Sequence, residues 1–158
     1  MDARSLLIDT TPFLSPRPAL DGLASELADR RVDGAPHTIA EIVAHLVFWQ
    51  DWFTGRCDGS SGPMPPAAAI GWPVPAPGRW DSVRRQFLDG LDRLVALGAA
   101  ADQARRIDPP IEFPPLAEYT VGEVVIHVGA HNAHHLGQVV LLRQMLGAWP
   151  PPAGAYTW

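Results

Sequence analysis

Proline residues divide this chain into segments, and their distribution constrains its fold more than any other feature. Seventeen of the 158 residues are proline, which is tolerated in the first turn of a helix but breaks a helix interior or the middle of a sheet. Between the proline-rich stretches, apolar residues recur with helical spacing, and no stretch shows the alternation that is typical of strands. The sequence therefore predicts an all-α protein.

Four segments are predicted to be helical, and together they indicate a four-helix bundle with long Pro-rich connections. They run from Pro18 to about Arg30, from Thr38 to about Phe53, from Asp81 or Ser82 to about Leu97, and from Thr120 to Leu146. The second and the fourth begin with Thr followed three residues later by Glu, which is the pattern of a capping box. Gly147 is of the residue type favoured just after a helix and would end the fourth.

Length and composition limit the class of protein. A chain of 158 residues is expected to form one domain over 1–158 with a sizeable core. Its net charge of −5 argues against nucleic acid or an anionic membrane as a partner. The acidic, proline-broken N-terminus is not expected to act as a signal peptide, no apolar run is expected to span a bilayer, and the lone Cys57 fits a reducing compartment. These observations predict a cytoplasmic protein.

The connection over 57–79 consists mostly of Gly, Ser, Pro and Ala. It is longer than a compact domain usually carries, so we expect it to be either functional or mobile. Trp72 and Trp80 lie within it and just after it, and they could line the mouth of a pocket. Cys57 stands at a helix end beside this connection and is interpreted as incidental rather than catalytic.

Four of the six histidines lie within nine residues of the last predicted helix, at positions 127, 131, 134 and 135. On a helical wheel, His131 and His135 share the arc of Val124 and Leu142, which is the expected core-facing side. Burying imidazoles there is costly unless each finds a partner, and a shared metal ion would satisfy several. Metal binding is therefore the favoured interpretation for this pair.

The other histidines are given different roles. We expect His127 to support the site or to pack between helices, His134 to lie at its rim, and His37 to be structural. His45 of the second helix, taken alone, is best read as a hydrogen-bonded core residue. If it were buried against the last helix, however, it would complete a three-imidazole site of the kind that catalytic metals use.

Several chemical signatures are absent or have a simpler explanation. The histidine run is not the H-E-x-x-H motif of zinc proteases, and the chain has no phosphate-binding loop, dinucleotide fingerprint or nucleophile elbow. Glu41 and Glu123 each precede a histidine by one turn. Helix capping explains both, although either could orient an imidazole or accept a proton.

Two long motifs and the closing AWPPP resemble the DinB-like (damage-inducible, YfiT-like) family of four-helix bundles. The motifs are HTIAEIVAHLVFWQDWF at 37–53 and YTVGEVVIHVGAHNAHHLGQVVLLRQMLG at 119–147. The resemblance implies one divalent transition metal bound by His45, His131 and His135, and members are often homodimers. This chain has Leu136 where many members have Arg, so any role of that Arg is not available here.

The resemblance also implies a range of functions. Some relatives transfer low-molecular-weight thiols such as bacillithiol or mycothiol, some isomerise maleylpyruvate with a thiol cofactor, and many are described as metal-dependent hydrolases. The leading hypothesis is a thiol S-transferase with a small-molecule substrate and a thiol cosubstrate. The alternatives are a hydrolase that uses metal-activated water, and a stress-related metal-binding or dimerisation module without catalysis. All-imidazole ligation suits Zn, Ni, Fe or Cu, and Zn, Ni and Fe are the expected metals.

Overall fold

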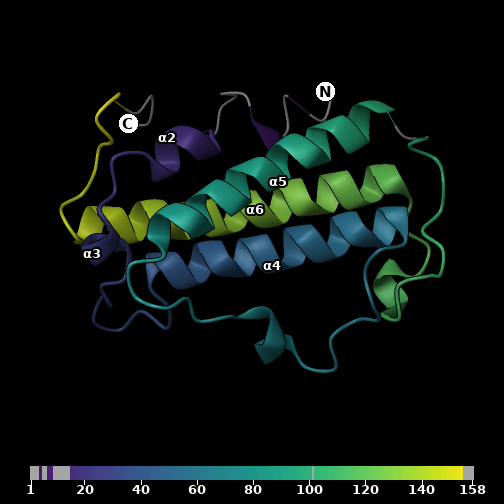
Figure 1. Ribbon diagram of the computed structural model, residues 1–158, viewed down its shortest axis with the longest axis horizontal. Helices are drawn as coiled ribbons and strands as arrows, with labels where there is room; N and C mark the ends of the chain where they lie inside the picture. The colour runs from purple at the N-terminus through teal and green to yellow at the C-terminus, as the bar shows by residue number, and fades with distance from the viewer. Residues whose placement is uncertain (1–3, 5–6, 9–14, 101, 155–158) are drawn as a thin grey trace.

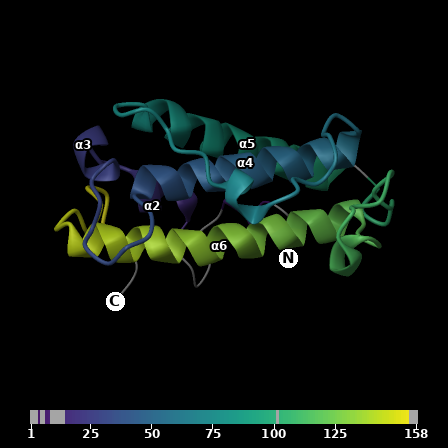
Figure 2. The ribbon, with the colours of Figure 1, turned by 90° about the horizontal axis from the view of Figure 1, so that it is seen from below.

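Helix α4 (Ile39–Asp58) packs along both of the other long helices, α5 (Trp80–Ala100) and α6 (Val121–Met145), which contact each other far less. This computed structural model describes residues 4, 7–8, 15–100 and 102–154. Figure 1 shows the three long helices side by side, and Figure 2 shows α4 between α5 and α6. The remaining elements are short: α2 (Pro16–Leu20), α3 (Ser25–Ala28), and the 3₁₀ helices η1 (Ala68–Gly71) and η2 (Pro114–Leu116).

The fold is all-helical, as the sequence predicts. Within the described residues, the extended backbone pairs only at an isolated bridge between Arg106 and Thr120. No described helix has the length and apolar character needed to cross a membrane.

Capping boxes begin α4 and α6, as predicted. In α4 the Thr38 hydroxyl accepts from the Glu41 N–H (3.2 Å), and the Glu41 carboxylate accepts from the Thr38 N–H (3.0 Å). Thr120 and Glu123 make the same pair of bonds at α6. These bonds satisfy backbone donors that a helix start leaves free, and they fix the rotational start of the two helices that carry the histidines.

The prediction of one helix from Pro18 to Arg30 is wrong, because the chain breaks between α2 and α3. Gly22 adopts a φ of +65°, a left-handed conformation that interrupts a helix. A Cβ at this glycine would lie 2.5 Å from the Pro152 ring, so the C-terminal segment packs closely against the break. The described residues therefore contain three long helices, and two short ones replace the predicted first helix.

Other helix boundaries also differ from the prediction. Helix α4 continues beyond Phe53 to Asp58, and α5 begins at Trp80 rather than after Asp81 or Ser82. Ala40 and Ala44 are both buried, because α4 packs against neighbours on several sides.

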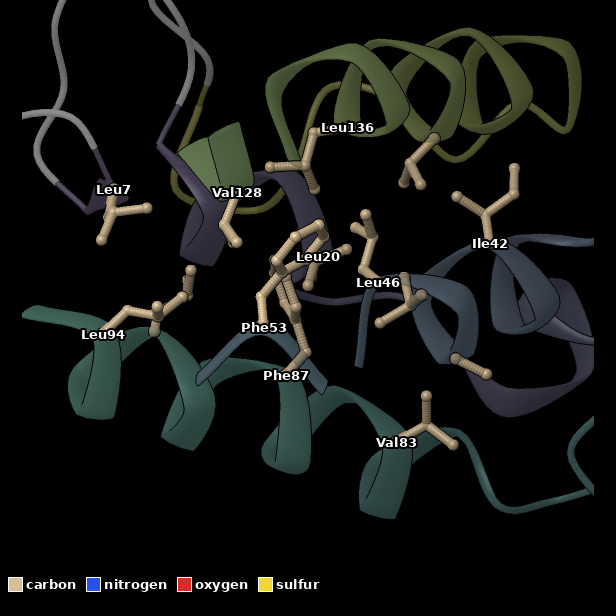
Figure 3. Packing of buried hydrophobic residues seen from close by; sticks show 14 of the residues in the cluster. Leu7, Leu20, Ile42, Leu46, Phe53, Val83, Phe87, Leu94, Val128 and Leu136 are labelled. Atoms are coloured by element: carbon tan, nitrogen blue, oxygen red, sulfur yellow. The ribbon is translucent and has the colours of Figure 1, made fainter. Parts of the chain in front are cut away.

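The core lies where the three long helices meet (Figure 3). Phe53 of α4 and Phe87 of α5 meet there, with Val128 and Leu136 contributed by α6. Burial of such side chains is the main stabilising contribution, at about 1.5–3 kcal/mol for each large apolar residue.

A series of buried hydrogen bonds between polar groups crosses the same core. The Gln50 amide donates to the Phe87 carbonyl (3.0 Å), and the Asn132 amide donates to Gln50 Oε1 (3.3 Å). Gly90 of α5 makes room for the Gln50 side chain, because a Cβ there would overlap the Gln50 amide nitrogen. The glycine therefore has a packing reason to occupy a helix interior, where it is otherwise unfavourable.

Gly90→Ala is expected to destabilise the protein by about 1–3 kcal/mol, because Gln50 would have to leave two buried hydrogen bonds. The matched control is Gly137→Ala in α6, where a Cβ meets nothing within 4 Å. That change should stabilise by about 0.5–1 kcal/mol through helix propensity. Urea unfolding measures both, and equal effects of the two substitutions would contradict the assigned role of Gly90.

Candidate metal centre

The structure brings together the three histidines that the sequence singles out, His45 of α4 with His131 and His135 of α6. Each can offer one ring nitrogen, and these nitrogens all lie within 4.8 Å of one another. We call this group the histidine triad. His45 and His135 are buried, and His131 is partly exposed, so the triad lies at the edge of the core. Its members could bind a metal ion.

The spacing of the triad fits a shared ion. The Nε2 atoms of His45 and His131 are 3.2 Å apart. Two imidazoles bound to one ion at about 2.1 Å have their nitrogens about 3.0–3.4 Å apart, depending on whether the angle at the ion is octahedral or tetrahedral. Because three neutral nitrogen donors suit a divalent transition metal, the side chains present fit the group that the sequence predicts.

Hydrogen bonds at the opposite ring nitrogens orient two of the imidazoles. His45 Nδ1 donates to the Gly71 carbonyl (2.5 Å), and His135 Nδ1 donates to Gln138 Oε1 (2.7 Å). Since these oxygens only accept, the proton sits on Nδ1 and the Nε2 lone pair stays free. Metal-ligating histidines are commonly held in this way by a carbonyl or carboxylate behind the ring.

Gly71 can lie close behind His45 because it has no side chain. A Cβ at this position would lie 2.5 Å from the Trp49 ring nitrogen and within 3 Å of two further indole atoms. Sequence reasoning missed Gly71 and the role of Gln138. The three-residue spacing of Gln138 from His135 was visible, but nothing in the sequence indicated that the carbonyl of Gly71 would lie behind His45.

The connection reaches the triad through Trp72. Figure 2 shows this segment with η1 lying over α4 on the side of α6. The Trp72 ring is stacked between His37 (3.8 Å, 7°) and His45 (3.7 Å, 12°), and it meets His135 edge-on at 5.6 Å.

The prediction that Trp80 lines a pocket mouth is wrong. Its side chain is buried, and its indole N–H donates to the Leu23 carbonyl (2.8 Å). Trp80 therefore fixes the start of α5 against the break between α2 and α3, whereas Trp72 does line a cavity.

A cavity of about 530 Å³ lies next to the triad, and His135 and Trp72 form part of its wall. The segment 33–37, Ile42 of α4 and the last turns of α6 form the rest. This volume lies in the range of small-molecule sites in proteins, which are typically 300–1,000 Å³.

Burial keeps the triad uncharged at neutral pH. It lowers the pKa of His45 to about 4, although the bond to Gly71 works in the opposite direction. It lowers the pKa of His131 to about 3, with a further contribution from the neighbouring His135 and His45. The pKa of His135 is lowered by burial too, against the raising effect of Gln138. Neutral imidazole is the form that binds a metal.

The remaining histidines lie outside the triad. His127 packs against the Phe53 ring (4.8 Å) and lies 3.3 Å from the Tyr119 hydroxyl. His134 is exposed beside Gln138, which is exposed too, whereas Asn132 is buried.

The two glutamates act at the caps. Glu41 also binds the Arg31 guanidinium (2.8 Å) and lies 3.3 Å from His37 Nδ1. Glu123 is exposed and bonds to the backbone and hydroxyl of Thr120.

Comparison with known protein families identifies the family of this chain. A sequence model of the DinB superfamily matches residues 17–139, which is well over half of its length. The chain belongs to the DinB superfamily. The match contains all three members of the triad, and it confirms the resemblance seen in the sequence. No curated protein and no solved structure matches this DinB-superfamily chain.

Cys57 is expected to be nearly unreactive in the native protein. Its side chain is 2% exposed, and burial raises the pKa of the thiol from 9.0 to about 11, despite the opposing effect of Arg105. At pH 8 a thiol-specific chromogenic disulfide should react at least about 100-fold more slowly with native than with denatured protein, because the thiolate is the nucleophile.

The control for this prediction is Ser60→Cys in a Cys57→Ser background, which places a thiol on an exposed residue nearby. That thiol should react at the rate of an unfolded chain. Reaction of native Cys57 within tenfold of the control rate would contradict its assignment as an inert core residue.

Proposed function

We propose that the protein is a metal-dependent enzyme that transfers a low-molecular-weight thiol to a small electrophilic substrate. His45, His131 and His135 would hold one divalent transition metal, with Zn, Ni or Fe as the candidates. The observation that carries the proposal is the convergence of the triad nitrogens, two of them oriented from behind, beside a cavity of about 530 Å³.

A metal held there would supply Lewis acidity, which lowers the pKa of a thiol or a water molecule and so generates a nucleophile at neutral pH. The chain itself contributes three uncharged donors and fixes the direction of two of them. His45 is held by Gly71 and flanked by Trp72, so its ring is kept from turning and from water on that side.

The lone cysteine of the chain is not a usable nucleophile, which supports thiol transfer. Cys57 is buried with a raised pKa, and its carbonyl, rather than its thiol, is what Arg105 contacts (2.6 Å). A nucleophile brought by a thiol cosubstrate fits this arrangement, because the metal and the cosubstrate then carry the chemistry.

Hydrolysis by metal-activated water is the alternative reaction. It commonly uses a carboxylate as general base, and the two glutamates nearest in sequence to histidines, Glu41 and Glu123, are engaged in capping boxes. Asp33 lies in the wall of the cavity beside the triad, so the preference for thiol transfer rests on the burial of Cys57 rather than on a missing carboxylate. A metal-binding or dimerisation module without catalysis is the remaining candidate.

Metal content tests the site directly. His131→Ala and His135→Ala should each retain less than about a tenth of the wild-type metal, because two imidazoles hold an ion far more weakly than three. The control is His134→Ala, which removes an exposed imidazole next to His135 in sequence and should leave metal content unchanged. Elemental analysis of the purified proteins gives the answer, and wild-type metal content in both triad variants would refute the assignment.

An activity assay separates the two reactions. With a chromogenic aryl halide as test electrophile, thiol transfer consumes bacillithiol or mycothiol as a C–S bond forms, halide leaves and a proton is released. Hydrolysis of an ester substrate proceeds without thiol. We expect metal-dependent thiol consumption in the wild type and the background rate in His131→Ala. Ester hydrolysis without thiol, lost in the same variant, would support the alternative instead.

A further inference from the structure

The cavity beside the triad has a definite wall chemistry. We name it the α6 pocket; it lies between the segment 33–37, Trp72, and the last turns of α6, and His135 is at one side. Most of its remaining wall is aliphatic or thioether, from Ile42, Leu141, Leu142 and Met145. Leu141 and Met145 are more than half exposed, which leaves large apolar side chains at the rim.

The charges around the pocket disfavour an anion. Of the described residues that line it, Asp33 carries the single carboxylate, and no arginine is among them. Arg31 lies nearby but is engaged with the Pro36 carbonyl (2.5 Å) and with both oxygens of Glu41. Apart from an ion held by the triad, an anionic group in this pocket would lie near a carboxylate without a cation from the protein to pair with, which is costly.

Trp72 contributes an edge rather than a stacking face. His37 and His45 cover the two faces of its ring at 3.8 and 3.7 Å. A ligand in the pocket consequently meets branched aliphatic side chains, a flexible methionine and the edge of an indole. Such walls bind through apolar contact and shape, and methionine adapts to ligands of different outline.

The wall formed by the segment 33–37 is held in place before any ligand binds. Arg31 bonds to the carbonyls of Ala35 and Pro36, and its ion pair with Glu41 ties the segment to the start of α4. A preformed pocket loses little conformational freedom on binding, so apolar burial contributes more fully to affinity.

From this geometry we infer that the α6 pocket binds an uncharged, apolar small molecule or group, and that its wall disfavours anions. The role of the pocket as the subsite for the electrophile rests on the function proposed above, whereas its binding of an apolar molecule does not. An apolar group bound there lies next to His135. The pocket would therefore favour apolar substrates at the triad.

The test compares two probes with the same ring system, naphthalene-2-methanol and naphthalene-2-sulfonate, by isothermal titration. The full-length protein is first stripped of metal with a chelator, so that the sulfonate has no ion to bind. The uncharged probe should bind at least about tenfold more tightly, because the sulfonate would lose its hydration without a partner. Equal or tighter binding of the sulfonate would overturn the inference.

Variants locate the binding. Leu141→Glu and Met145→Glu should each weaken binding of the uncharged probe by at least about tenfold, since each places a charge at the apolar rim. The control is Ile126→Glu, which makes the same kind of change at an exposed position of α6 that does not line the pocket. Unchanged binding in both rim variants, or equal loss in the control, would overturn the inference.

The same titration on His131→Ala separates this inference from the proposed function. The uncharged probe should bind this variant within about twofold of wild type, because His131 does not line the pocket. Loss of metal with retained probe binding supports both proposals. If His131→Ala retains its metal, the metal site alone is refuted. If the wild-type protein does not bind the uncharged probe, the pocket assignment alone is refuted.

Discussion

The hydrogen bond from His45 Nδ1 to the Gly71 carbonyl joins the central helix to the long connection, and the rest of the site depends on it. It directs Nε2 of His45 toward His131, and it places Trp72 against the imidazole. Trp72 in turn completes the wall of the α6 pocket. A single backbone oxygen thus sets the protonation of a candidate ligand and the position of a pocket residue, and it can do so because residue 71 has no side chain.

The antiparallel course of α4 and α6 explains which histidines meet. Figure 1 shows the two helices running in opposite directions along the bundle. His45 follows the capping box of α4 by two turns, and His127 occupies the equivalent place after the capping box of α6. Because the helices are antiparallel, these equivalent positions lie at opposite ends, so His127 meets Phe53 instead. His131 and His135, further along α6, are the ones that reach His45.

The sequence predicted those features of the structure that depend on interactions between residues close together in the chain. The two capping boxes, the end of α6 near Gly147 and the shared face of His131 and His135 depend on neighbouring residues, and they were predictable. The break at Gly22 and the Gly71 carbonyl depend on segments distant in the chain that pack against them, Pro152 in one case and α4 in the other. Periodicity holds no information about such contacts, and the pairing of Gln50 with Asn132 escaped prediction for the same reason.

The triad draws its members from positions 86 residues apart, with α5 and both long connections between them. The site exists only when α4 and α6 are packed together, so an ion bound there is released when the chain unfolds. Such an ion stabilises the folded state by mass action, by about 1.4 kcal/mol for each tenfold excess of free metal over its dissociation constant. An ion shared by α4 and α6 would thus link two helices that are far apart in the sequence. This link matters because α2 and α3 are short, so the described part of the bundle has three long helices.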